Sequence, residues 1–263
     1  MTRALVMKDT FLRLLSLAFV LFAMVGCRFG TLPDPNDDSQ TYVTGAILQR
    51  NVAEAYRLLD LRVARGEIGL AERDNLIREL VLNMLENVDP SKIPNNDAFR
   101  YADLYRQAGK LEVAQQLMER AVETAKTPDR KVNDTLQLGR IQALRGNVKE
   151  AIKTVRSTFD SPPRDKAPIL LFVLYEFVPA ALGKESELDA QIGQVLEGAI
   201  DQHLMTVVDP ELKNGQAFLE ASPKHLQNAW RKLFEIYREA GREDLLRAAI
   251  EHKDRIDSDQ GEF

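Results

Sequence analysis

Apolar side chains recur three and four residues apart from Thr41 onward, and the strict apolar/polar alternation of a β-strand is almost absent. This spacing places apolar side chains on one face of successive helices. Proline cannot continue a helix, and proline-containing breaks lie at Asp89-Pro90, Pro128, Pro162-Pro163 and Asp209-Pro210. We therefore predict an all-α body over residues 41–252 and a polar tail over residues 253–263.

Glycines recur between the predicted helical segments, at Gly66, Gly109, Gly146, Gly183 and Gly241. The three middle glycines are spaced 37 and 37 residues apart. Glycine tolerates a positive φ, so it can end one helix and let the chain reverse into the next. A constant period in the thirties indicates a stack of helix pairs.

Large and small side chains take set positions around these glycines. Tyr105 precedes Gly109 by four residues, and Ala114 follows it by five. Ala151 holds the same place after Gly146, and Trp230, Leu233 and Tyr237 lead into Gly241. These positions resemble the tetratricopeptide repeat. The resemblance implies a right-handed α-solenoid of about five antiparallel helix pairs, in which small residues let helices approach closely. The units around Gly66 and Gly183 match loosely.

An apolar run over residues 14–25 follows three basic residues, Arg3, Lys8 and Arg13. The run is shorter than the roughly 20 apolar residues of a membrane span and is typical of a secretory signal. The segment Met24-Val25-Gly26-Cys27 resembles the bacterial lipobox, which implies cleavage before Cys27 and acylation of this cysteine. Residues 1–26 are then a signal peptide. The alternatives are an ordinary secretory signal with an incidental cysteine, or a short uncleaved anchor.

Residues 27–40 contain two prolines, one glycine and three aspartates, which predicts a polar, flexible tether behind the lipidated cysteine. Arg28 stands where retention in the inner membrane would call for Asp, so the resemblance implies an outer-membrane lipoprotein that faces the periplasm. Removal of residues 1–26 shifts the formal charge from -5 to about -7. An acidic body without a basic stripe is expected to bind neither nucleic acid nor an anionic bilayer by charge alone.

The sequence offers no motif that predicts catalysis or metal binding. His203, His225 and His252 are far apart, and Cys27 is the only cysteine, whereas a zinc site needs clustered ligands. Phosphate-binding loops and nucleophile elbows are absent from the sequence. We therefore predict no catalytic residue, no metal and no cofactor.

The resemblance also implies a surface for a peptide or protein, formed by the first helix of each pair. Its predicted residues are Phe99, Asp103, Arg106, Arg140, Phe177, Glu235 and Arg238. Arg106 or Arg140 could hold a carboxylate through two parallel hydrogen bonds. The alternative is that these are ordinary exposed residues that pair along their own helices.

These observations together predict a membrane-anchored scaffold that binds a protein partner in an envelope assembly or secretion complex. The anchor would raise the effective concentration of the body at the membrane. One alternative is an enzyme, or a regulator of an enzyme, that acts on cell-envelope polymers, with residues 198–221 as the place to seek a cleft. Another is a purely structural lipoprotein.

Overall fold

The computed structural model describes residues 44–159, 169–206 and 213–260. The predicted signal peptide, Cys27 and the tether lie outside these stretches. Every regular element in them is a helix, and none is a β-strand, which confirms the all-α class. The body forms a compact unit that begins at Thr44, three residues after the predicted start.

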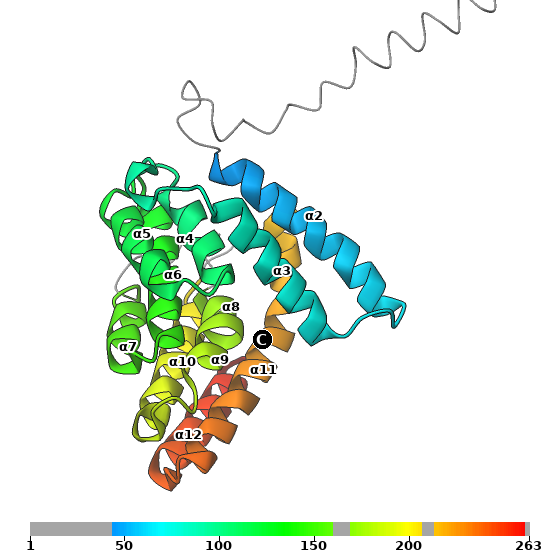
Figure 1. The fold of residues 1–263 in the computed structure, drawn as a ribbon. Helices are drawn as coiled ribbons and strands as arrows, with labels where there is room; N and C mark the ends of the chain where they lie inside the picture. The colour runs from blue at the N-terminus through cyan, green and yellow to red at the C-terminus, as the bar shows by residue number, and fades with distance from the viewer. Residues whose placement is uncertain (1–43, 160–168, 207–212, 261–263) are drawn as a thin grey trace, which may run out of the picture. The chain divides into compact units, whose positions relative to one another are not determined.

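The helices follow one another with short connections (Figure 1). They are α2 (Gly45–Ala64), α3 (Leu70–Leu85), η1 (Pro90–Lys92), α4 (Ala98–Gln107), α5 (Leu111–Glu123), α6 (Pro128–Leu144), α7 (Val148–Arg156), α8 (Ile169–Phe172), η2 (Val173–Phe177), α9 (Val178–Ala181), η3 (Ser186–Leu188), α10 (Asp189–Leu204), α11 (Lys213–Glu239) and α12 (Glu243–Gln260).

Each helix packs mainly on its neighbours in sequence. The contacting pairs include α2 with α3, α4 with α5, α5 with α6, α6 with α7, α10 with α11, and α11 with α12. Of the short helices that follow α7, η2 and α9 contact both α6 and α10, and α8 contacts α10. One apolar core runs from Leu136 in α6 to Ala249 in α12. Packing between sequence neighbours lets the body grow as a series of local units.

The predicted glycine turns are present in the structure. Gly66, Gly109, Gly146, Gly183 and Gly241 all have a φ between 66° and 88°, and no other described residue has a positive φ. At Gly109 the glycine N–H donates to Arg106 and the Lys110 N–H donates to Tyr105. These two bonds use carbonyls that the end of α4 would otherwise leave without partners. A side chain at this φ would be strained.

Small residues permit close contact where helices cross. Ala114 and Ala151 are fully buried. A Cβ added to Gly139 in α6 would lie 2.5 Å from Cγ2 of Val155 in α7, and one added to Gly193 in α10 would lie 2.6 Å from the Tyr237 ring in α11. These helix pairs therefore depend on the missing side chain of a glycine, because packed interiors leave no room for a further methyl group.

The segment η2 is a π-helix, in which the Val178 N–H donates to the carbonyl of Val173, five residues back. Pro179 follows directly, and it has no N–H to give to the Tyr175 carbonyl four residues back. The wider π turn accommodates this missing donor and adds a residue to the turn. The residues before η2 and those after it therefore do not share the facing directions that one continuous α-helix would give them.

One boundary differs from the sequence prediction. The residues predicted as a polar tail from Lys253 belong to α12, which continues to Gln260. An ion pair between Lys253 and Asp257 spans one turn of this segment and supports the helix. The long α11 contains Pro223 inside the helix. Within the described residues, every helix is too short or too polar to cross a bilayer.

Candidate functional site

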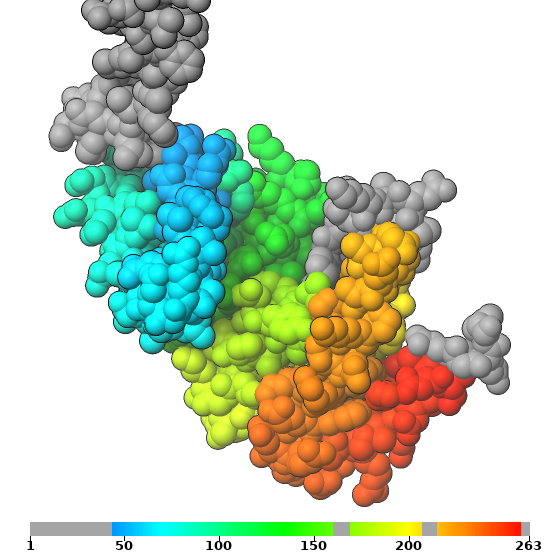
Figure 2. Space-filling view, turned by 90° about the vertical axis from the view of Figure 1, so that its right-hand side faces the viewer, coloured from blue at the N-terminus to red at the C-terminus, as the bar shows by residue number. Residues whose placement is uncertain are grey.

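A hollow opens on one side of the described helical body. Figure 2 shows it between α2 and α3 on one side and α11 on the other, with middle parts of the chain at its back. We use the term inner face for side chains of α2, α4, α6, η2 and α11 that are linked by hydrogen bonds, by ion pairs or by the effect of one charge on the next group. Its central members are Tyr56, Asp103, Arg106, Arg140, Tyr175, Glu176 and His225.

Arg106 and Asp103 form the part of the inner face that belongs to α4. Arg106 donates from Nη2 and Nε to Oδ1 of Asp103, at 2.6 and 3.1 Å. Gln107 donates to the other carboxylate oxygen at 2.8 Å. Asp103 therefore accepts three hydrogen bonds from its own helix. The guanidinium of Arg106 is mostly buried, with 17% of its side chain exposed, so the pair is held in a defined position.

Arg140 continues the row on α6 and binds Glu176 of η2, with 2.5 Å between Nη2 and Oε2. Burial lowers the pKa of Arg140, and the nearby positive charge of Arg106 lowers it further, while Glu176 and Asp103 act in the opposite direction. The two guanidinium groups are thus close enough to repel each other. The carboxylates around them offset this repulsion.

Tyr56 brings α2 into the same cluster. Burial raises the pKa of its hydroxyl, and Asp74 raises it further; the charges of Arg106 and Asp103 also act on it, with opposite signs. The guanidinium of Arg73 lies 5.7 Å from the centre of the Tyr56 ring. The hydroxyl of Tyr56 in α2 is therefore within range of the charges of the Arg106–Asp103 pair in α4.

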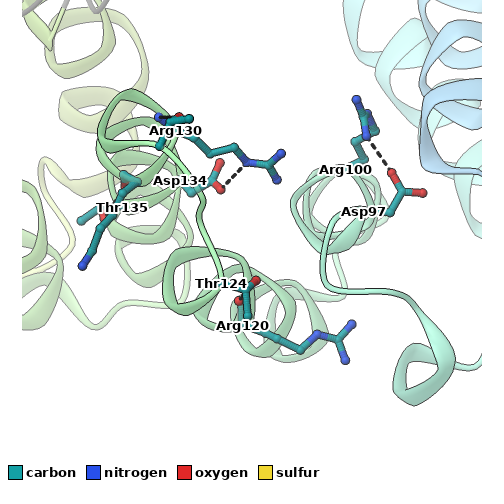
Figure 3. Close-up of polar contacts among 9 residues, drawn as sticks. Asp97, Arg100, Arg120, Thr124, Arg130, Asp134 and Thr135 are labelled. Atoms are coloured by element: carbon teal, nitrogen blue, oxygen red, sulfur yellow. Dashed lines mark hydrogen bonds and ion pairs between the residues drawn. The ribbon is translucent and has the colours of Figure 1, made fainter.

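Phe99 lies between two guanidinium groups near the start of α4. Its ring centre is 3.5 Å from Arg130 of α6 and 4.4 Å from Arg100 of α4, distances that are typical of cation–π contacts. Each arginine is also held by a buried carboxylate: Arg130 binds Asp134 at 3.0 Å and Arg100 binds Asp97 at 2.9 Å. Figure 3 shows Arg130 extending from α6 toward α4. The ring of Phe99 is therefore covered by charged side chains.

Tyr175 joins η2 to α11 at the other end of the row. Its hydroxyl lies 3.4 Å from Nδ1 of His225 and accepts a hydrogen bond of 3.2 Å from the Asn228 side chain. About half of the Tyr175 side chain stays exposed, at 49%. Glu235 follows Asn228 by two helical turns on α11 and pairs with Lys232 at 2.5 Å. Arg238 is exposed on the last turn of this helix.

The structure corrects one predicted inner-face residue. Phe177 is completely buried in the core, with an exposed fraction of 0%, and cannot contact a ligand. Its neighbour Glu176 takes the inner position instead, because the π turn changes the register of η2. The alignment on repeat positions also missed Tyr56, Tyr175 and His225. Of these three, only Tyr175 could have been suspected from the sequence. Pro179 lies four residues later and disturbs the helix around Tyr175, which indicates that the side chains there depart from a regular helical register.

The other two histidines, His203 and His252, make contacts that do not involve the central members of the inner face through hydrogen bonds or ion pairs. Nε2 of His203 lies 2.7 Å from Oγ of Ser222, and its ring packs on Phe218. His252 of α12 lies 3.6 Å from Glu197 and 3.5 Å from Asp201, both of α10. Burial raises the pKa of Asp201, while His252 opposes that shift. Glu197 also accepts a hydrogen bond from Tyr237. These contacts join α10, α11 and α12.

Among the residues that the structure describes, no three histidine, cysteine, aspartate or glutamate side chains are grouped so that they could hold a metal ion. A comparison with protein-family models finds no match for this chain, and a comparison with curated proteins finds no significant relative. The assignment of a function therefore depends on the residues themselves.

Proposed function

We propose that this protein is a lipid-anchored periplasmic scaffold, whose body is a right-handed solenoid similar to tetratricopeptide repeats and binds a protein on its inner face. Acyl chains on Cys27 hold it to a membrane, with the outer membrane as the expected location. The partner belongs to an envelope assembly or secretion complex. The proposal includes no chemical step, metal or cofactor.

The repeat-like architecture is supported by the turns and the close helix contacts. All five glycines that the sequence places between helical segments have a positive φ. Gly139 and Ala151 lie where the α6–α7 pair is closest, and Ala114 is buried in α5. Neighbouring helices in sequence are also neighbours in space. This is the packing that a stack of helix pairs requires.

The single observation that carries the binding role is the row of arginines on the inner face. Arg106 and Arg140 are mostly buried, each pairs with a carboxylate, and their charges act on each other. Such fixed guanidinium groups can accept a carboxylate of a partner in place of Asp103 or Glu176, because the guanidinium fork matches carboxylate geometry. Tyr56 and Tyr175 lie at the two ends of the row and can pack against an extended chain.

The anchor is tested by the substitution Cys27→Ser in the full chain. If Cys27 is the acylation site, the variant leaves the membrane fraction or accumulates as an unprocessed precursor, and a fatty-acid label no longer enters the protein. Unchanged fractionation together with an unchanged label would refute the lipoprotein assignment.

The binding face is tested by site-specific photocrosslinking in living cells. A photoreactive phenylalanine analogue replaces Tyr175 on the inner face, and a matched variant carries it at Ile250, an aliphatic residue of α12 that is 41% exposed. We expect a discrete crosslinked protein at position 175 and none at position 250. The same crosslinks at both positions, or none at position 175, would contradict a partner on the inner face.

A further inference from the structure

The outward side of α2 carries three exposed aliphatic side chains. Ile47, Leu58 and Leu61 are 41%, 49% and 45% exposed. The buried residues of α2 are Gly45, Leu48 and Val52. With 100° of turn per residue, the three exposed aliphatic side chains lie on the side opposite this buried stripe. They face away from α3 and α4, the helices on which α2 packs.

Basic side chains flank these aliphatic residues. By the same helical geometry, Arg50 and Arg57 lie on one side of the apolar stripe and Arg62 on the other. All three are exposed. Glu54 lies within the stripe and binds Arg57 at 2.6 Å, and Glu67 binds Arg62 at 3.3 Å, so two of the three positive charges are offset and Arg50 is left as the free one among the ion pairs that the described residues form. We call Ile47, Leu58, Leu61, Arg50, Arg57 and Arg62 the outer α2 face.

The two ends of the helical body carry opposite charge. Residues 45–67 contain four arginines and three acidic residues, a net charge of +1, whereas α12 contains six acidic residues and three lysines or arginines, a net charge of -3. The full chain has a net charge of -5, so the basic end is the exception. An apolar stripe bordered by arginine on a helix surface is the composition of a helix that lies at the surface of a membrane with anionic headgroups.

The position of α2 in the chain points to the same occupant. Arg28 to Val43 are sixteen residues, so even a fully extended connection keeps α2 within roughly 60 Å of a lipid group on Cys27. Three aliphatic side chains would bind a bilayer weakly from solution. Beside an anchored cysteine the same contact is intramolecular, and a weak affinity is sufficient.

We propose that the outer α2 face lies on the anionic surface of the membrane that holds the lipid anchor. The contact orients the helical body, with α12 and its acidic surface directed away from the lipid. The overall acidity of the chain predicts no attraction to an anionic surface. The uneven distribution of charges along the body, however, allows its α2 end to be attracted. The inference rests on the proposed anchor at Cys27.

The test uses the intact processed protein in lipid vesicles. Because Cys27 is the only native cysteine, the variant Leu61→Cys offers a single thiol for an environment-sensitive fluorophore once Cys27 is acylated. Ile250→Cys on α12 is the matched control. Vesicles contain phosphatidylethanolamine, with or without phosphatidylglycerol, and brominated lipids report contact by quenching.

We expect quenching and a blue-shifted emission at position 61 in vesicles with phosphatidylglycerol, and neither at position 250. Replacement of Arg50, Arg57 and Arg62 by Gln should weaken the contact by up to about fivefold for each arginine, because each loses its attraction to the headgroups. Equal quenching at positions 61 and 250 would overturn the proposal. A blue shift at position 61 that grows with protein concentration without lipid would also overturn it, since a second copy would then cover this face.

The anchor and the α2 contact can fail separately. The mass of the amino-terminal peptide reports acylation on the same sample. An acylated protein without quenching at position 61 rejects the α2 contact and keeps the anchor. An unacylated chain that is still quenched at position 61 when vesicles are added rejects the anchor and keeps the α2 contact.

Discussion

Glu176 in η2 and Arg140 in α6 form an ion pair of 2.5 Å that joins the π-helical segment to the inner face. Arg140 is mostly buried and lies near the like charge of Arg106. Glu176 therefore does more than pair with one residue, since it also reduces the repulsion between two guanidinium groups. Its position depends on the π turn, so the local backbone of η2 and the electrostatics of the inner face are coupled.

We expect Glu176→Gln to lower the free energy of unfolding by about 1–2 kcal/mol, between the values typical of exposed and of buried pairs. Urea unfolding measures this change. The matched control is Glu54→Gln, which breaks the pair with Arg57, whose side chains are 60% and 55% exposed. Its cost should be much smaller and close to zero, because water screens an exposed pair. A double-mutant cycle with Arg140→Gln that gives no coupling energy would show that the pair does not stabilise the fold.

The contact between α6 and α7 predicts a second effect on stability. A Cβ on residue 139 would lie 2.5 Å from Cγ2 of Val155. We expect Gly139→Ala to lower the free energy of unfolding by about 1–3 kcal/mol through overpacking. In a Val155→Ala background the clashing atom is gone, so the same substitution should cost less. An equal cost of Gly139→Ala in both backgrounds would show that Val155 is not the obstacle.

The turns were predictable from the sequence because their cause is local. A single residue type readily tolerates a positive φ, so the glycines between predicted helical segments located all five reversals, at Gly66, Gly109, Gly146, Gly183 and Gly241. The helical class followed from the apolar period in the same way. The segment after Lys253 was less predictable, because its polar composition suits both a frayed tail and an exposed helix; pairs such as Lys253 with Asp257 support the helix.

The inner face was predicted only in part. Phe99, Asp103, Arg106 and Arg140 lie in units that match the repeat pattern well, so alignment could place them on one surface. Phe177 was wrong because facing direction depends on register, and the π turn before Pro179 changes it. Contacts such as Tyr175 with His225 connect residues 50 apart. Periodicity within one helix carries no information on such a pair.

A third prediction separates backbone strain from lack of space at a glycine. Gly109 has a φ of 76°, and nothing lies within 4 Å of a Cβ added there. We expect Gly109→Ala to cost about 1–2 kcal/mol from backbone strain alone. Gly69 is the matched control, because its surroundings are also open but its φ is -88°. Gly69→Ala should change stability by less than about 0.5 kcal/mol. Equal costs in thermal unfolding would contradict this explanation of the turns.

The last prediction concerns pH and the contact between α10 and α11. Burial lowers the pKa of His203 below its ordinary 6.5, and the charge of His225 adds to this effect. The ring is buried, bonds Ser222 and packs on Phe218. The folded protein therefore keeps His203 neutral at a pH at which the unfolded chain already protonates it. Since the unfolded state then binds more protons, stability falls as the pH drops below 6.5, and this loss ends below the lowered folded pKa.

The substitution His203→Gln tests this effect, because glutamine retains a hydrogen-bonding side chain but does not titrate. Other groups also change stability with pH, so the useful quantity is the difference in unfolding free energy between wild type and variant. We expect this difference to be constant above about pH 7.5. Toward about pH 5 the wild type should lose stability relative to the variant. A difference that stays constant across this whole range would show that His203 has the same pKa in the folded and unfolded protein. The α10–α11 contact would then not depend on a neutral histidine.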